Sequence, residues 1–358
     1  MVIKNNKVFI KNNYSENNAI KKGDELLSIN DIPIQDVIDE MNNSISGESE
    51  YVKNTMIEIA SFPVMYWLLK EHKKSYYIKI KDKDDVTHNL KIKAIRGLKY
   101  FSSRYEADPF QREFKFIDSV AYIRPGTFAN KNVNADISDT ATFNNSEFVG
   151  FINSAFEEIY NQKAKDLIID LRNNMGGSNT FSDKMLAYIA DQPFRFCSKF
   201  SVKTSQSTKD FWVKMNDTIL TVLKEEILSH DDGEIFEVDI PYNEPRKDSL
   251  KFEGNVYVLI NRYSYSQAVV TAAMVQDYGF GTLIGEVTAD IPTVYGSAQQ
   301  FRLPNTKLAI TYPKAFGVRP NGDETIHGAI PEHIVNENTF IKGDEILNYT
   351  LNLTRKRK

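Results

Sequence analysis

The sequence predicts an α/β protein in which a core of alternating strands and helices follows a small α+β module. Beyond residue 118, short apolar runs alternate with segments of helical periodicity, a pattern typical of parallel strands covered by helices. The first hundred residues differ, because their strands alternate in polarity and are joined by a hairpin-type turn. A chain of 358 residues is long enough for two domains. We place these domains at 1–97 and 98–358.

The composition is that of an ordinary globular protein, with 41% hydrophobic and 26% charged residues. A net charge of -4 gives no electrostatic reason to expect nucleic acid or an anionic membrane as a partner. No run of about 18 apolar residues occurs, so we expect no membrane span. Cys197 is the single cysteine, and the five histidines lack metal-ligand spacing, so we expect neither a metal nor another cofactor.

The N-terminal module combines a glycine-aspartate turn with alternating strands and two helical segments. Its Gly-Asp-Glu-Leu-Leu-Ser-Ile-Asn phrase, which begins at Gly23, resembles PDZ domains. That resemblance implies binding of peptide C-termini as an added strand on a sheet edge. Pro63 interrupts the second helical segment. The expected elements are a strand at 25–29, helices at 35–41 and 50–69, and paired strands at 75–81 and 89–95.

The second part of the chain repeats the order strand, helix, strand. Residues 191–254 are more polar and less regular, and we expect an insertion there that forms a lid or a wall of the substrate site. A late hairpin is expected around Pro304. The expected strands are 119–123, 167–171, 256–260, 282–284, 299–303 and 308–312, and the expected helices are 148–159, 180–190 and 267–277.

Two loops lie at the ends of predicted parallel strands, where ligand sites form in such folds. Gly176 and Gly177 can expose backbone N–H groups that hold an oxyanion, although a simple tight turn is the other interpretation. Ser266 comes where a buried strand gives way to a helix, a position that favours a nucleophile and lets the Gln267 N–H face the oxyanion. The structural alternative for Ser266 is a helix N-cap.

The string that begins at Leu171, Leu-Arg-Asn-Asn-Met-Gly-Gly, resembles the Leu-Arg-Asn-Asn-Gly-Gly-Gly signature of the S41 serine peptidases, the tail-specific or C-terminal processing proteases. The family places its nucleophile eleven residues before the aspartate of a Gln-Asp-Tyr-Gly-like phrase, which here matches Ser266 and Asp277. Gly-Glu-Val-Thr, ending at Thr288, matches another landmark. The resemblance covers about 119–335 and implies a crotonase- or ClpP-like core of repeated βαβ units.

The general base departs from the family pattern. Processing proteases carry a lysine three residues after the threonine of Gly-Glu-x-Thr, and this sequence has Ile291 there. Tricorn-like members use a histidine on the first core strand, where this sequence has Arg124. Neither Ile291 nor Arg124 can accept a proton, and the adjacent Asp290 is the wrong group to replace the lysine, so a Ser–Lys dyad is absent. Arg124 is either a contact for a substrate carboxylate or oxyanion, or part of a structural ion pair.

Several residues remain open as the base. Glu286 corresponds to an acidic position that tricorn-like members use, and burial can tune a carboxyl group toward neutral pH. His327 is the histidine nearest in sequence to the core landmarks, followed by His333. Tyr265 and Tyr295 are further candidates. The sequence does not decide among them.

Three functional readings follow. The first is a serine endopeptidase or processing peptidase with Ser266 as nucleophile, acting on peptides or proteins recognised by their C-termini. The second is a catalytically impaired S41-like peptide-binding protein, which Ile291 and Arg124 favour. The third, an acyl-CoA enzyme of crotonase type, is disfavoured by the Ser266–Asp277 spacing and the PDZ-like module.

Localisation follows only from the resemblance. S41 proteins usually act outside the cytoplasm, so we expect a protein of the cell envelope or a secreted protein. Residues 1–7 are not a signal peptide. The expectation therefore requires a signal that is absent from this sequence, and the location is cytoplasmic if Met1 is the native start.

Overall fold

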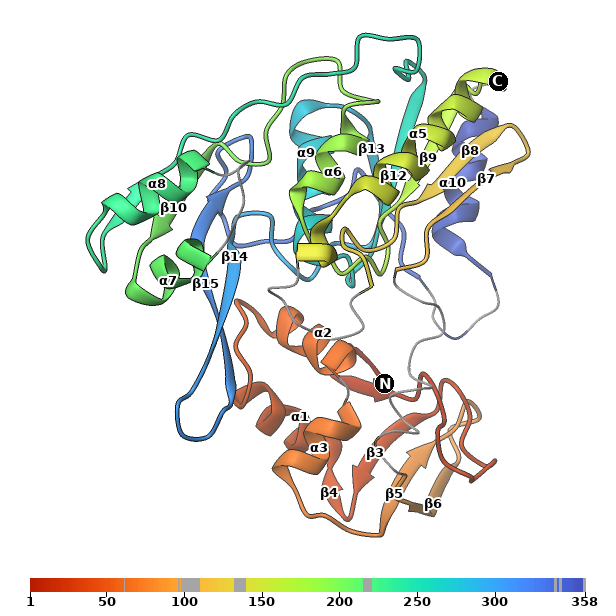
Figure 1. The fold of residues 1–358 in the computed structure, drawn as a ribbon. Helices are drawn as coiled ribbons and strands as arrows, with labels where there is room; N and C mark the ends of the chain where they lie inside the picture. Colours follow the sequence, from red (N-terminus) through yellow and green to blue (C-terminus); the bar gives the residue numbers. More distant parts are fainter. Residues whose placement is uncertain are drawn as a thin grey trace. The chain divides into compact units, whose positions relative to one another are not determined.

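The computed structural model describes residues 1–60, 62–95, 97, 110–131, 140–214, 221–337, 340 and 343–356. They belong to two compact units (Figure 1), of which the first comprises Met1–Asp108 with Asn336–Glu345, and the second Pro109–Val335 with Ile346–Lys358. The predicted boundary at 97/98 lies in a stretch described only at Gly97, so it remains a prediction.

In its described residues, the first unit is a six-stranded antiparallel sheet with three helices, α1 to α3, packed on it. The helical segment predicted at 50–69 is two helices, and Pro63 lies in the first turn of the second, where its missing N–H removes no helical hydrogen bond. The strands are β1 (Val2–Lys4), β2 (Lys7–Phe9), β3 (Glu25–Ile29), β4 (Ile32–Pro33), β5 (Ser75–Lys81) and β6 (Thr87–Lys93), and the helices are α1 (Ile34–Asn43), α2 (Glu50–Ala60) and α3 (Phe62–Leu69).

The main sheet of the second unit has six strands in the order β16-β13-β12-β9-β8-β7. Five of them are parallel, which confirms the predicted α/β core. The antiparallel β7 and the short β16 were not predicted, because neither forms a buried apolar run. The strands are β7 (Glu113–Ile117), β8 (Val120–Arg124), β9 (Asp166–Asp170), β12 (Asn255–Ile260), β13 (Thr282–Gly285) and β16 (His333–Ile334).

Helices cover both faces of this sheet. The face with Ala121, Leu167 and Val258 packs against α5 (Ser146–Asn161), α6 (Asn179–Leu186) and α9 (Gln267–Tyr278) in the largest apolar core. The opposite face packs against α10 (Glu345–Lys356), which was not predicted. A short 3-10 helix, η1 (Thr140–Phe143), precedes α5.

The insertion at 191–254 contains regular structure that pairs with the late hairpin. Its two strands join that hairpin in a four-stranded antiparallel sheet, covered by an apolar cluster that includes Trp212 and Ile227. Its role as a lid or substrate wall remains a prediction. The elements are β10 (Lys199–Lys203), α7 (Gln206–Lys214), α8 (Thr221–Ser229), β11 (Ile235–Glu237), β14 (Val294–Arg302) and β15 (Ala309–Val318).

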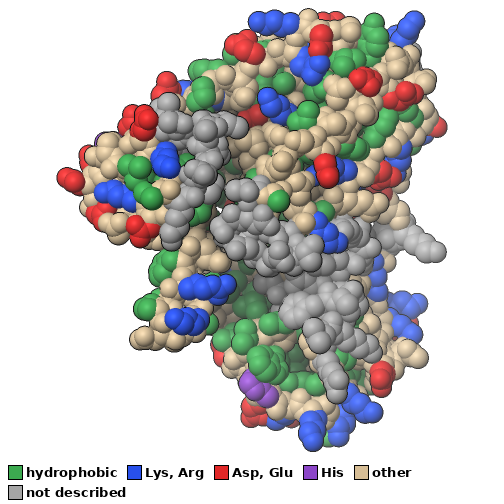
Figure 2. Space-filling model, viewed as in Figure 1, with side chains coloured by type: hydrophobic (Ala, Val, Ile, Leu, Met, Phe, Trp, Pro, Cys, Tyr) green, Lys and Arg blue, Asp and Glu red, His purple; other side chains and the backbone are tan. Residues whose placement is uncertain are grey.

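Acidic and basic side chains are interspersed over the face of the molecule seen in Figure 2. In the described part of the chain, no helix is both long enough and apolar enough to cross a membrane. The same residues contain no group of three or more His, Cys, Asp or Glu side chains placed to hold a metal ion.

Asp183 on α6 is a buried carboxyl group that makes stability depend on pH. Burial raises the pKa of Asp183 from 3.8 to about 6, partly offset by hydrogen bonds from Asn179 and Asn243. The folded state therefore binds this proton more tightly than the unfolded state. This stabilisation is complete below about pH 4 and is lost as the pH rises through about 6. Such a pKa rise corresponds to about 3 kcal/mol.

We therefore expect Asp183→Asn to raise the melting temperature at about pH 8 and to have little effect at about pH 4, because asparagine carries no charge to bury. Thermal unfolding scans at the two pH values measure this difference. A shift of the same size at both values would contradict it.

Candidate active site

The two loops that the sequence singled out lie against each other. Strands β9 and β12 are parallel neighbours, so their carboxyl ends share one edge of the sheet. The loops are joined by hydrogen bonds from the Tyr265 N–H to the Asn174 carbonyl oxygen (2.9 Å) and from the Asn173 N–H to Asn261 Oδ1 (3.1 Å). The Ser264 hydroxyl donates to the Leu171 carbonyl oxygen at 2.9 Å. The two loops are therefore close together, as their positions after neighbouring strands predicted.

Gly176 packs directly against the candidate nucleophile. Its φ is +82°, and a Cβ atom there would lie 2.7 Å from both Ser266 Cβ and the Gln267 nitrogen. Gly177 has φ +133°, and its Cβ would lie 2.1 Å from the Phe128 carbonyl oxygen. Both positions therefore require glycine for conformation and for space.

Gly177→Ala is expected to destabilise the protein by about 2 kcal/mol or more, because the new methyl group meets the Phe128 backbone, which cannot move aside. Gly233→Ala is a matched control, since Gly233 has a positive φ of +90° but no atom within 4 Å of an added Cβ. Urea unfolding of both variants separates steric clash from backbone strain. Equal losses would show that the close approach at Gly177 is unimportant.

Ser266 has a backbone conformation that non-glycine residues rarely adopt, with φ 52° and ψ -124°. It precedes α9 at the N-cap position, but its side chain accepts no hydrogen bond from the helix. Its side chain is partly exposed. Holding a residue in such a backbone conformation lowers the stability of the folded state by about 1–3 kcal/mol, and such residues are found preferentially at functional sites. This geometry favours the nucleophile over the simple N-cap interpretation.

The predicted oxyanion donors differ in availability. The Gly176 N–H donates to Asn174 Oδ1 at 2.8 Å, so it is already engaged. Within the described part of the chain, the N–H groups of Gly177 and Gln267 make no hydrogen bond. Of the three predicted donors, the Gly177 and Gln267 N–H groups are therefore the available ones, whereas the Gly176 N–H is engaged by Asn174.

Asn174 fixes this loop, a role that the sequence did not suggest. Its buried side chain accepts from the Gly176 N–H and donates to the Gly126 carbonyl oxygen at 2.7 Å. Its own carbonyl oxygen accepts from Tyr265. One asparagine thus connects the glycine loop to the segment before Ser266.

Asp290 is the carboxylate that the structure brings to the nucleophile. Its Oδ2 accepts a hydrogen bond from the Ser266 backbone N–H at 2.5 Å, and the residue is buried. The neighbouring Ile291 is also buried and apolar. The position that holds the family's lysine therefore supplies no proton acceptor here, whereas the residue before it does.

Glu286 is placed near the same loops but is ion-paired. Its carboxylate lies 3.4 Å from Arg262 Nε, and both side chains are largely buried. The segments that carry them are joined by a hydrogen bond from the Ala289 N–H to the Arg262 carbonyl oxygen at 3.3 Å. Glu286 is therefore held by a cation and not directed to Ser266 by any recorded contact in the described chain.

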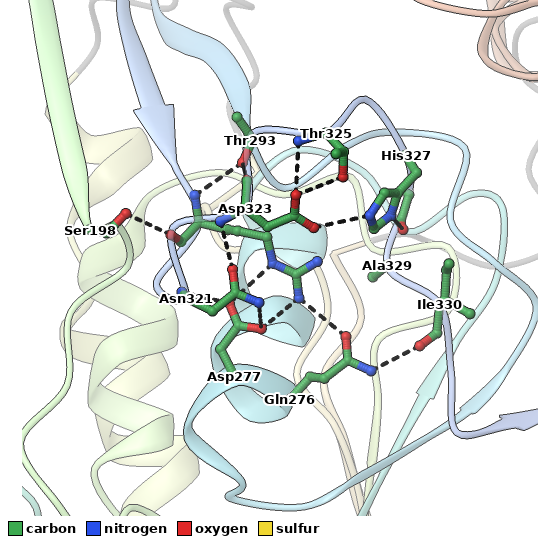
Figure 3. A network of polar contacts seen from close by, with 12 residues as sticks. Ser198, Gln276, Asp277, Thr293, Asn321, Asp323, Thr325, His327, Ala329 and Ile330 are labelled. Atoms are coloured by element: carbon green, nitrogen blue, oxygen red, sulfur yellow. Dashed lines mark hydrogen bonds and ion pairs between the residues drawn. The ribbon is translucent and has the colours of Figure 1, made fainter.

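Asp277 lies at the other end of α9 from Ser266. Eleven residues of helix separate the two by about 16 Å, because an α-helix rises 1.5 Å per residue. The Asp277 carboxylate accepts from Arg319 Nη2 at 2.6 Å and Nε at 3.1 Å and from the N–H groups of Asn321 (Figure 3). The structure therefore places Asp277 in an ion pair that anchors the end of the helix, and its catalytic role remains a prediction.

His327 belongs to the neighbouring polar network of Figure 3. Its Nδ1 lies 2.7 Å from the Gly328 carbonyl oxygen and its Nε2 lies 3.1 Å from Asp323 Oδ2. Both ring nitrogens face oxygen atoms of this network. Gly328 packs against Thr288, where an added Cβ would lie 1.9 Å from the Thr288 carbonyl oxygen. The structure therefore places His327 in this polar network, and its role as a base remains a prediction.

Arg124 belongs to a buried polar cluster on the sheet face that α10 covers. It ends β8 two residues after Tyr122, on the same face of the strand. Tyr122 donates to Asp170 Oδ2 at 2.7 Å, and Arg172 makes a bidentate pair with the same carboxylate. Burial alone would raise the pKa of Asp170, but the Arg172 guanidinium outweighs it and the pKa is lowered. The positive charge of Arg124 also helps to lower the pKa of Asp170, so this arginine lies beside the cluster.

A serine at the start of a helix, packed against a glycine loop on a parallel βαβ scaffold, is typical of serine hydrolases that use a backbone oxyanion hole. Residues 119–335 match the model of peptidase family S41, which is more than half of the chain. The chain therefore belongs to peptidase family S41. Residues 3–106 match a PDZ domain model.

Individual relatives are more distant. A tail-specific protease of Haemophilus influenzae is 29% identical over 141 residues, which span 39% of this chain and 15% of that protein. Mature CPAF complexed with lactacystin has a TM-score of 0.66 at 16% identity, covering 100% of this chain and 81% of that chain. Mature CPAF alone has a TM-score of 0.66 at 14% identity, covering 100% of this chain and 80% of that chain. At these identities the two structures show the fold alone.

Proposed function

We propose that the protein is a serine endopeptidase or processing peptidase in which Ser266 attacks the scissile carbonyl. The Gly177 and Gln267 N–H groups hold the oxyanion that forms. One observation carries this proposal: Ser266 has a strained backbone conformation and packs against Gly176, and its hydroxyl makes no capping hydrogen bond to α9.

The substrates we propose are peptides or unfolded proteins, recruited through their C-termini by the PDZ domain. The matching test incubates the full chain with one peptide carrying either a free or an amidated C-terminus, and identifies products by mass spectrometry. Preferential cleavage of the free-carboxylate form supports recruitment by the C-terminus. Equal cleavage of both removes that part of the proposal, and no cleavage at all counts against a peptidase.

We assign the general base to Asp290. The carboxylate is already hydrogen-bonded to the Ser266 N–H, and any serine hydroxyl lies about 3–4 Å from its own backbone nitrogen. The hydroxyl proton can therefore pass to Asp290 after a side-chain rotation. Ile291 offers no competing acceptor, and Glu286 is paired with Arg262.

Asp290→Asn is expected to lower kcat about 10²–10⁴-fold with little change in KM, because the amide cannot accept a proton but keeps a hydrogen-bond acceptor for the Ser266 N–H. Steady-state kinetics measure both constants. A rise in activity would instead identify Asp290 as an inhibitory carboxylate that repels the oxyanion.

A second candidate function is a peptide-binding protein that has lost catalysis. The apolar Ile291 favours it, together with the negative charge of Asp290 beside the Ser266 N–H. Under this alternative, peptides bind the chain without turnover, and Ser266→Ala leaves their dissociation constant unchanged.

A further inference from the structure

A second serine with a positive φ, Ser297, lies on the hairpin β14–β15. Ser297 is exposed and has a positive φ of 55°. It lies opposite Lys314 in the antiparallel pairing, between the partnered positions Gly296–Ala315 and Ala298–Pro313. The Lys314 ammonium donates to the Ser297 hydroxyl and, at 3.4 Å, to the Ser297 carbonyl oxygen.

Lys314 is an unusual residue for this position, because it is buried. Its Nζ lies 5.8 Å from the centre of the Trp212 ring on α7, and no ion pair to a carboxylate is recorded for it in the described chain. Burial is the cause that lowers the pKa of Lys314 to about 8, and no neighbouring charge contributes. A substantial fraction of this amine is therefore neutral in mildly alkaline solution.

Two buried N–H donors lack acceptors in the same layer. Gln299 is two residues from Ser297 along β14, and its Nε2 has no partner, while Tyr312 on β15 donates to its Oε1 at 3.0 Å. Trp212 Nε1 is likewise without a partner. The Tyr312 hydroxyl also contacts Ser207 on α7, so the helix and the hairpin enclose these groups together. Buried donors without an acceptor are rare in folded proteins.

We propose that Ser297 and Lys314 form a second nucleophile–base pair, separate from Ser266, that is acylated by small carboxylic esters. The Ser297 oxygen bonds to the ester carbonyl carbon while Lys314 Nζ takes the hydroxyl proton. The ester C–O bond then breaks, and the proton passes from Lys314 to the departing alkoxide. Water, deprotonated by Lys314, hydrolyses the acyl-serine and regenerates the pair.

The test uses the full chain with Ser266→Ala, so that it is independent of the proposed peptidase. The protein is treated with p-nitrophenyl acetate, and acetylated peptides are mapped by mass spectrometry. We expect an acetyl group on Ser297, formed at least 10-fold faster than on the exposed Ser229. The rate should rise as the pH increases through about 8, because the neutral amine is the base.

Lys314→Met removes the amine but keeps an apolar chain in the buried position, and it is expected to lower Ser297 acetylation at least 10-fold. Lys307→Met, at an exposed lysine of the same hairpin, is the control. Circular dichroism shows that both variants are folded. If Ser297 reacts no faster than Ser229, or if Lys314→Met leaves its rate unchanged in folded protein, the proposal is overturned.

Discussion

Ser266→Ala is expected to lower kcat/KM for peptide hydrolysis by at least about 10³-fold, because the variant lacks the atom that attacks the carbonyl. The fold should be unaffected. The Ser266 hydroxyl does not cap α9, and alanine at φ 52° is no more strained than serine. The melting temperature is therefore expected to change by no more than about 2 °C.

Ser229→Ala is the control for this experiment, since Ser229 is an exposed serine at the end of α8 whose hydroxyl donates to the Glu226 carbonyl oxygen. It should retain full activity. Turnover by Ser266→Ala equal to that of the unchanged chain would remove Ser266 from the mechanism and leave the peptide-binding alternative as the better account of this site.

Asp277→Ala is expected to destabilise the protein by about 3–5 kcal/mol, because it leaves the Arg319 guanidinium buried without its counter-charge. Both side chains are nearly inaccessible, at 3% and 5% exposure, so water cannot replace the lost contact. Urea unfolding measures the loss. Folded Asp277→Ala should keep a kcat close to that of the unchanged chain, since the residue lies about three helical turns from Ser266.

The double variant Asp277→Ala with Arg319→Ala separates the ion pair from other effects. Removing both charges should cost less than the sum of the two single losses. If instead the single Asp277 variant unfolds like the unchanged chain but has lost activity, the residue acts in catalysis, as the sequence first suggested.

Most of the core was predictable because its strands are short apolar runs separated by helical periodicity. The parallel order and the three helices α5, α6 and α9 follow from that pattern. The sheet formed by β10, β11, β14 and β15 was only partly predictable. Strand β10 pairs with β15, which lies more than 100 residues further along the chain, and this pairing depends on tertiary contacts that no local pattern records.

The candidate active site was also predictable only in part. The proximity of Gly176 to Ser266 was predictable, because both loops follow neighbouring parallel strands. The separation of Asp277 from Ser266 could also have been read from the sequence, since both belong to one predicted helix. The contact between Asp290 and the Ser266 N–H could not have been predicted, because it depends on the path of an irregular loop after β13.

The central claim is that Ser266 is an activated nucleophile, and labelling with a fluorophosphonate probe tests it most directly. The modified peptide is identified by mass spectrometry in the unchanged chain, in Ser266→Ala and in Ser229→Ala. The account predicts a phosphonyl group on Ser266, lost in Ser266→Ala and kept in Ser229→Ala. An unlabelled Ser266 in folded protein would contradict an activated hydroxyl at this site.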